Sequence, residues 1–305
     1  MTTRRTFLAL AAVVPVTACG VNNNPMADSS GGASQGSGTS EIVVGSANFT
    51  ESQVLAELYA QALAAKGVAA STKPSIGSRE VYIKGLKDGS VQIVPEYTGN
   101  LLAFLDDGNP AQTAEQIETA LPAAVGEGLA VLKSSPATDQ DVYVVTAETA
   151  KTKGIASLAD LKKISAQSVL GGPGELKERP YGPPGLEGIY GATFKEFKTY
   201  DSPAVKVKDL NDGKIQVATF FTTEAAIGDN GYVMLADPEM MILPQNVIPL
   251  VAKAVADNTD AVAALDAVQA ALTTEDLTAL NKQVDTDHLD AKTVAGDWLK
   301  TKGLA

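Results

Sequence analysis

The sequence contains the segment Leu86-Lys87-Asp88-Gly89-Ser90-Val91-Gln92-Ile93 and returns to the same pattern at Leu210-Asn211-Asp212-Gly213-Lys214-Ile215-Gln216-Val217. Six of the eight positions match in residue type. Each copy has the form of a helix end, an Asp-Gly turn and the start of a strand. The match predicts two structurally equivalent halves, and a chance similarity between two helix-turn-strand units is the alternative.

Both copies lead to an aromatic residue in the same register. Tyr97 follows Asp88 by nine residues, and Phe221 follows Asp212 by nine residues. In open α/β sheets, ligands bind beyond the carboxyl ends of the strands. The repeat therefore predicts that Tyr97 and Phe221 occupy equivalent places in two facing lobes and approach one cleft.

Alternating strands and helices extend outward from the repeat. The apolar run Ile42-Val43-Val44 meets Gly45, and Thr50-Glu51-Ser52-Gln53 has the form of a capping box that opens a helix. Apolar residues then recur with helical spacing up to Lys66-Gly67. A second unit begins at Ser168-Val169-Leu170-Gly171 and continues through a Gly/Pro-rich loop to 185–190. This order predicts an α/β fold with helices on the faces of its sheets.

The N-terminus predicts export. Arg4 and Arg5 precede an apolar core from Phe7 to Val16 that is too short to span a bilayer. The run Val16-Thr17-Ala18-Cys19 resembles the lipobox of bacterial lipoproteins, so we expect residues 1–19 to be a signal peptide with lipidation at Cys19. The protein is then expected at the cell membrane, lipid-anchored on the extracytoplasmic face. An ordinary signal sequence with a stray cysteine is the alternative.

Residues 20–40 consist almost wholly of Gly, Ser, Asn and other small residues. Such a composition cannot bury enough surface to order, so we expect a flexible linker. A linker of this kind would hold the domain roughly 25 Å from its anchor. The remainder of the chain is long enough for a large core or for two lobes.

Composition argues against several functions. The formal net charge of −12 disfavours nucleic-acid binding, and the single cysteine leaves no disulfide within the chain. The one histidine, His288, lies in a polar stretch, so most Cys/His and Ser/His/Asp schemes are disfavoured. Asp139 and Asp141 could support glycosidic acid/base chemistry, but their spacing is common in loops. We expect no enzyme, no cofactor and no metal site.

Six strings carry a resemblance to a known family. They are Gly45-Ser46-Ala47-Asn48-Phe49-Thr50-Glu51, Pro95-Glu96-Tyr97-Thr98-Gly99-Asn100, Arg179-Pro180, Gly185-Leu186, Leu280-Asn281-Lys282-Gln283-Val284-Asp285 and Trp298-Leu299. With them the domain resembles the glycine betaine/choline/carnitine-binding proteins of osmoprotectant ABC importers. The resemblance implies a two-lobed type II periplasmic-binding-protein fold, each lobe a mixed sheet flanked by helices, with the ligand cleft between the lobes.

The same resemblance implies where the lobes divide and what they bind. The family's chain crosses twice between lobes, so lobe I is expected at 41–140 plus 246–305 and lobe II at 141–245. The expected partners are a small-molecule solute and the permease and ATPase subunits of the importer. We expect a monomer.

The family binds a quaternary ammonium in an aromatic cage, at about 0.5 to 2 kcal/mol per ring. Tyr97 and Tyr143 match two cage tyrosines, and Asp141 sits where a backbone group faces the ligand. Glu175 and Arg179 fall where the family has an acidic residue and an arginine that grips a ligand carboxylate. A surface ion pair is the alternative for Arg179.

Departures from the family pattern leave the exact ligand open. Asn48 keeps its place in the first string, but the family's lysine beside it is Ala47, and its small hydroxyl residue is Asn100. The third and fourth cage tyrosines are Phe221 and Gln245. Arg79, in Gly77-Ser78-Arg79-Glu80, adds a charge, and we expect it to pair with a carboxylate, with a ligand contact as the alternative. Asp209, Asn211 and Asp212 are interpreted as turn residues.

These observations predict an extracytoplasmic lipoprotein that captures a betaine-, choline- or carnitine-like solute and delivers it to an ABC importer. A second hypothesis is the same role for a non-cationic or larger solute, such as a polyol or an aromatic compound. A third is a ligand-sensing lipoprotein that takes no part in transport.

Overall fold

The computed structural model describes residues 41–305. The predictions for the signal peptide, the lipobox with Cys19 and the linker lie outside the described residues. Within 41–305, no helix is both long and apolar enough to cross a membrane.

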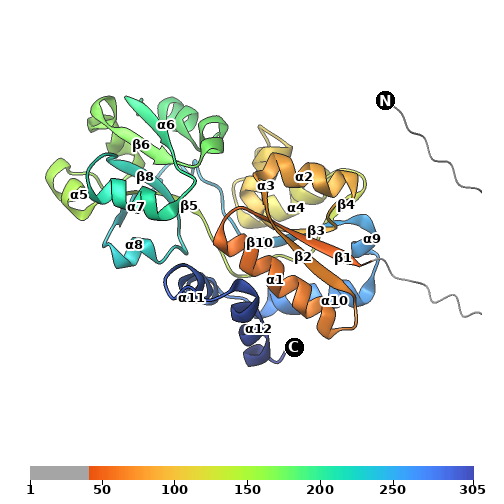
Figure 1. Ribbon diagram of the computed structural model, residues 1–305. Coiled ribbons are helices and arrows are strands. Elements are labelled where there is room, and N and C mark those ends of the chain that lie inside the picture. The colour runs from red at the N-terminus through yellow and green to blue at the C-terminus, as the bar shows by residue number, and fades with distance from the viewer. Residues whose placement is uncertain (1–40) are drawn as a thin grey trace, which may run out of the picture. The chain divides into compact units, whose positions relative to one another are not determined.

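Two five-stranded mixed sheets organise the chain (Figure 1). The first has the order β2-β1-β3-β10-β4, in which β10 runs antiparallel to its neighbours. The second has the order β7-β6-β8-β5-β9, in which β5 runs antiparallel to its neighbours. The strands are β1 (Ile42–Ala47), β2 (Ala70–Gly77), β3 (Ile93–Tyr97), β4 (Leu129–Val131), β5 (Asp141–Val145), β6 (Val169–Gly172), β7 (Glu196–Thr199), β8 (Val217–Phe221), β9 (Val233–Met234) and β10 (Val247–Ala252).

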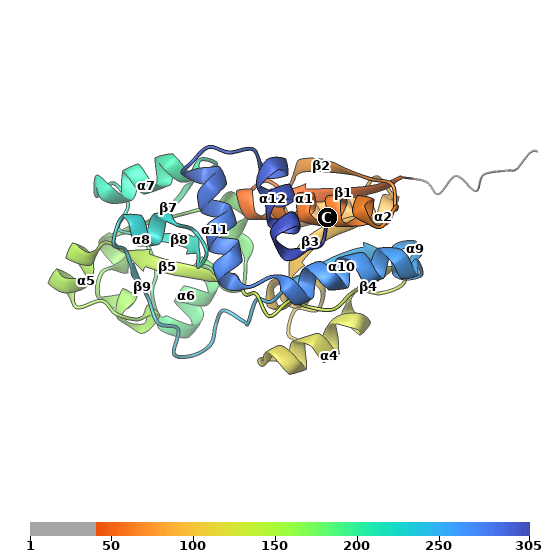
Figure 2. The same ribbon diagram turned by 90° about the horizontal axis from the view of Figure 1, so that it is seen from below.

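Helices cover both faces of each sheet (Figures 1 and 2). They are α1 (Thr50–Ala65), α2 (Arg79–Asp88), α3 (Thr98–Leu105), α4 (Ala114–Ala124), α5 (Ala147–Lys153), α6 (Pro183–Tyr190), α7 (Pro203–Asn211), α8 (Ala226–Asp229), α9 (Lys253–Ala256), α10 (Thr259–Ala271), α11 (Thr274–Asp285) and α12 (Ala291–Lys302). The 3-10 helices are η1 (Leu158–Lys163), η2 (Ser165–Gln167) and η3 (Gly174–Glu178). Four apolar clusters, one on each face of each sheet, form the core.

The chain passes between the sheets twice, after β4 and after β9, and the two crossing segments lie side by side. Thr138 and Asn246 form an isolated antiparallel bridge. The Asp139 backbone N–H donates to the Gln245 carbonyl oxygen at 3.0 Å. These paired crossings place the carboxyl ends of β3 and β8 on either side of one space.

The sequence repeat is a structural repeat. In the first copy, the Gln92 side chain accepts from the Val43 N–H at 2.8 Å and donates to the Gly89 carbonyl at 2.6 Å. In the second, Gln216 accepts from the Val169 N–H at 2.9 Å and donates to the Gly213 carbonyl at 2.7 Å. Each glutamine therefore joins the turn to the neighbouring parallel strand. Both turn glycines adopt positive φ, which side chains disfavour.

Two local predictions are wrong. Thr50 is the first residue of α1, whose N-cap is Phe49, and its hydroxyl donates to Asp285 at 2.5 Å, so no capping box forms. Asp209 and Asn211 lie inside α7 and not in the turn that follows it. Asp209 is buried, and its carboxylate accepts from Lys198, Lys214 and Tyr200. In both cases, contacts with residues outside the helix determine the local hydrogen bonding.

Candidate ligand-binding site

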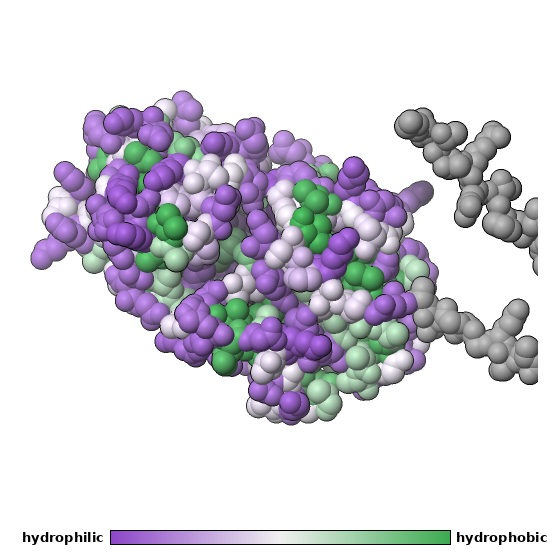
Figure 3. Space-filling model, in the orientation of Figure 1, coloured by the Kyte–Doolittle hydropathy of each residue, from purple (hydrophilic) through white to green (hydrophobic). Residues whose placement is uncertain are grey.

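A cavity of about 330 Å³ lies between the two sheets. Its walls come from the carboxyl ends of β1, β3 and β8, the first turns of α1 and α7, and the loop that includes η3. Figure 3 shows the surface hollowed between the two halves of the molecule. Seven of the residues predicted to contact the ligand border this cavity. They are Asn48, Tyr97, Asn100, Asp141, Glu175, Arg179 and Phe221.

Three aromatic rings stand together on the cavity wall. Tyr97 and Phe221 end the equivalent strands β3 and β8, as the repeat predicts. Phe49, which follows β1, lies between them, with ring centroids 5.0 Å from Phe221 and 6.2 Å from Tyr97. Sequence reasoning missed Phe49 as a wall residue, although its place directly after a strand end was a usable signal.

The Tyr97 hydroxyl is held by a buried acidic cluster. It donates to Glu51 at 2.7 Å, and the other carboxylate oxygen of Glu51 accepts from Thr223 and Asn281, each at 2.6 Å. Asp139 lies beside Glu51, and burial together with the negative charge of Glu51 raises the pKa of Asp139 well above its ordinary value. The cluster fixes the Tyr97 ring and links α1 to the loop after β8. Sequence reasoning missed Glu51, Thr223 and Asn281 as parts of this cluster.

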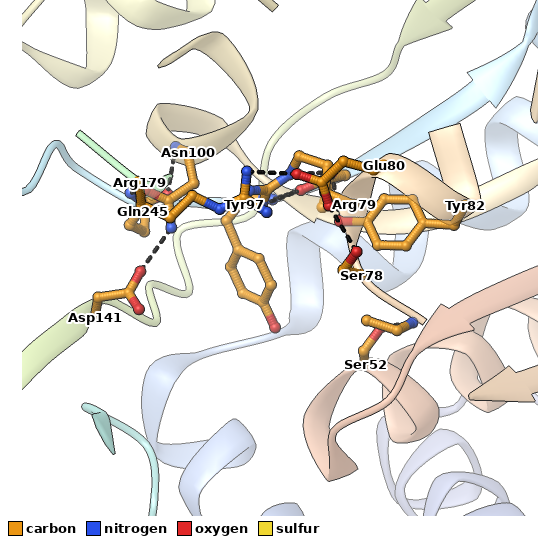
Figure 4. Close-up of polar contacts among 12 residues, drawn as sticks. Ser52, Ser78, Arg79, Glu80, Tyr82, Tyr97, Asn100, Asp141, Arg179 and Gln245 are labelled. Atoms are coloured by element: carbon orange, nitrogen blue, oxygen red, sulfur yellow. Dashed lines mark hydrogen bonds and ion pairs between the residues drawn. The ribbon is translucent and has the colours of Figure 1, made fainter. Parts of the chain in front are cut away.

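Asn100 and Asp141 connect the two halves across the cavity (Figure 4). The Asn100 side-chain amide donates to Asp141 at 2.6 Å. Gln245 is fully buried and does not border the cavity. Its side chain instead accepts from the Asn100 backbone N–H at 2.9 Å and donates to the Asn100 side chain at 2.7 Å. Gln245 therefore orients Asn100.

Arg79 pairs with a carboxylate, as expected. Its guanidinium donates twice to Glu96, at 2.8 and 2.9 Å, and Tyr82 donates to the same carboxylate at 2.7 Å. Both ion-pair partners are buried. The bidentate geometry leaves Arg79 as a fixed part of the wall.

Arg179 forms the ion pair considered as the alternative for it, and it does so at the edge of the cavity. It borders the cavity, and it also donates to Glu80 of α2 at 2.8 Å. Its guanidinium lies 5.6 Å from the centroid of the Phe104 ring. Because Glu80 and Phe104 belong to the first sheet's half and Arg179 to the second's, these contacts join the halves at the cavity (Figure 4).

Tyr143 is not brought into the cavity. Its side chain is fully buried in the core of the second sheet, and its hydroxyl donates to the Tyr181 carbonyl oxygen at 2.7 Å. Tyr181 does border the cavity. In this arrangement Tyr143 supports the wall from behind.

The two sheets, the double crossing and the cavity between them define a two-lobed binding protein. Comparison with known proteins agrees. The family model described as the substrate binding domain of ABC-type glycine betaine transport systems matches residues 40–301, and the chain belongs to this family. The predicted two-lobed type II periplasmic-binding-protein fold is thereby confirmed. The family's role is to bind the substrate of an ABC-type transport system.

Individual relatives match over most of their length. The glycine betaine-binding protein YehZ of Escherichia coli (strain K12) is 28% identical over 278 residues, which is 87% of this chain and 91% of the relative. The solved apo structure of YehZ is 27% identical with a TM-score of 0.62, and covers 87% of this chain and 100% of that chain. A structure of a glycine betaine/carnitine/choline ABC transporter has 18% identity, a TM-score of 0.69, and coverage of 87% and 99%.

Proposed function

We propose that this protein captures a quaternary-ammonium solute of the glycine betaine, choline or carnitine type and presents it to the permease of an ABC importer. The observation that carries the proposal is the group of three rings, Phe49, Tyr97 and Phe221, on the wall of the cavity. Aromatic faces attract a cation that cannot donate hydrogen bonds. YehZ, whose name describes a glycine betaine-binding protein, supports the same class of ligand.

Each predicted contact has a proposed role. The rings receive the ammonium head, and the half-buried carboxylate of Asp141, held by Asn100, balances its charge. Arg179, Glu175 and Asn48 contact the rest of the ligand from the loop and rim positions that they occupy. Tyr143 and Gln245 act indirectly, because they hold Tyr181 and Asn100.

Closure of the two lobes over the ligand is the proposed signal to the importer. We keep the limits 41–140 plus 246–305 and 141–245 as the proposed lobes. Lipidation at Cys19 would hold the protein on the extracytoplasmic face of the cell membrane, where a monomer would meet the permease while the ATPase subunit works on the other face.

One observation favours a second candidate, an uncharged solute with hydroxyl groups. Among residues 41–305, the buried Asn281 Oδ1 and Thr219 Oγ1 atoms have no hydrogen-bond partner, and both residues border the cavity. A polyol would supply donors that a quaternary ammonium lacks.

Calorimetric titration of the purified protein with glycine betaine, choline, carnitine and proline betaine tests the proposal, with a polyol such as sorbitol as the competing arm. We expect saturable heat and a thermal shift with at least one quaternary ammonium. A folded protein that responds to sorbitol alone would contradict the proposal and support the second candidate.

A further inference from the structure

Lys206 is a buried cation on the cavity wall that no sequence motif indicated. It lies on α7, and its side chain is 9% exposed. Within residues 41–305 its ammonium makes one hydrogen bond, to the Thr219 carbonyl oxygen at 2.8 Å. An ammonium has three N–H donors, so donors remain for a ligand.

The nearest acid leaves this ammonium incompletely paired. The Glu224 carboxylate lies 3.7 Å from Lys206 Nζ, too far for a hydrogen bond. That carboxylate accepts instead from the Phe221 backbone N–H at 2.9 Å. Burial lowers the pKa of Lys206, and the charge of Glu224 acts in the opposite direction. An anionic group in the cavity would offset this desolvation.

The other cations of the cavity wall are already engaged. Arg79 donates twice to Glu96, and Arg179 donates to Glu80. Of the cations that border the cavity within 41–305, Lys206 alone lacks a hydrogen-bonded carboxylate. A ligand carboxylate can therefore pair with Lys206 without breaking an existing hydrogen-bonded ion pair.

Two neighbouring features favour an anion at the same place. Ser202, the N-cap of α7, makes no side-chain capping bond, and Ser202 and Pro203 both border the cavity, so the positive end of the helix faces it. Thr219 is 3% exposed and borders the cavity, and its buried hydroxyl has no hydrogen-bond partner within residues 41–305. A hydroxyl can donate to a carboxylate.

We propose that Lys206 binds the carboxylate of a zwitterionic ligand and so selects betaine-like solutes over choline, which has no carboxylate. This inference rests on the proposed function. In this assignment the rings of Phe49, Tyr97 and Phe221 bind the ammonium end of the ligand. Lys206 and the first turn of α7 bind its anionic end.

Titration of wild type and Lys206→Met with glycine betaine and with choline tests this role. We expect Lys206→Met to weaken glycine betaine about tenfold or more, because a buried charge pair loses one partner. Choline affinity should stay unchanged or rise, since a like charge is removed from the cavity. Lys208→Met is the matched control, because Lys208 lies on the same helix, is 68% exposed and pairs with Asp212.

A second variant keeps the test decisive. If Lys206→Met does not fold, because Glu224 loses its cation, Lys206→Met with Glu224→Gln removes both charges and is titrated instead. An unchanged ratio of betaine to choline affinity, or an equal loss of both, would overturn the role of Lys206 and leave the proposed function standing. Wild type that binds neither solute would overturn the proposed function and this inference with it.

Discussion

Tyr97 contributes a ring to the cavity and a hydroxyl to the buried acidic cluster, and substitutions can separate the two. Tyr97→Ala should weaken quaternary-ammonium binding about tenfold, because a cation over an aromatic ring gains up to about 2 kcal/mol when desolvated. Tyr97→Phe keeps the ring and should retain affinity, although Glu51 loses one donor. Calorimetry measures both. Equal affinities of wild type and Tyr97→Ala would show that the Tyr97 ring does not contribute to ligand binding.

The raised pKa of Asp139 predicts that the stability of the folded protein depends on pH. Burial and the charge of Glu51 raise its pKa in the folded state, so the folded protein binds more protons than the unfolded chain above the ordinary carboxyl range. Its contribution to stability is complete at low pH and is lost as pH rises toward the raised pKa. In Asp139→Asn a neutral amide replaces the carboxyl and removes the like charge beside Glu51. We expect its Tm to exceed that of wild type by an amount that grows from pH 5 to pH 8.

Thermal unfolding at several pH values checks this expectation, with Asp257→Asn as the exposed control. Asp257 is 63% exposed, so its amide variant should follow wild type across the range. A constant difference between Asp139→Asn and wild type would show that the carboxyl pair holds no extra proton.

Individual site residues differ in how far the sequence could reveal them. The repeat placed Tyr97 and Phe221 on one cavity because strand ends follow from local pattern. Lys206 carries no such signal. Glu51 was part of a helix-start pattern and of a family string, but neither indicated that packing against other segments buries it beside the cavity. Tyr143 and Gln245 show the converse, since the family motif indicated them but the structure encloses both.

Helix α3 and the second crossing segment depend on the absence of a side chain at Gly99. A Cβ atom there would lie 2.5 Å from the Pro244 carbonyl oxygen and 2.6 Å from Leu243 Cβ. We expect Gly99→Ala to destabilise the protein by about 1 to 3 kcal/mol and to weaken ligand binding, because α3 must shift and carry Asn100 with it. Urea denaturation and calorimetry measure the two effects.

Gly188→Ala is the control for this helix substitution. Gly188 lies in α6, and a Cβ atom there meets nothing within 4 Å. Alanine should stabilise the helix by about 0.5 to 1 kcal/mol. If Gly99→Ala behaved like Gly188→Ala, close packing between α3 and the crossing segment would not determine the site.

Local pattern was sufficient for most elements and failed where distant segments compete. The Asp-Gly turns, the strands that follow them and the glutamines that fasten them could be predicted as a unit because each interaction is close in sequence or repeated. The capping box at Thr50 could not, because Asp285 lies 235 residues away and takes its hydroxyl. The pairing of the crossing segments likewise depends on residues more than a hundred positions apart.

Several polar contacts join the lobes, among them Asn100 with Asp141, Thr223 with Glu51, and Arg179 with Glu80. The contact of Thr223 with Glu51 is buried and Asp141 is half-buried, whereas the Glu80 side chain is 50% exposed. Such contacts favour an arrangement in which the lobes are held together. They set how much of the ligand's binding free energy is spent on closure.

Glu80→Ala should therefore shift the ligand-free protein toward an open form. A partly exposed ion pair contributes about 0.2 to 1 kcal/mol, so the ratio of closed to open molecules should fall by up to about fivefold. Small-angle scattering should show a larger radius of gyration without ligand, and a return to the wild-type value with saturating ligand. Asp257→Ala removes a local ion pair with Lys253 and should leave scattering unchanged. Identical ligand-free curves for Glu80→Ala and wild type would mean that this pair does not hold the lobes together.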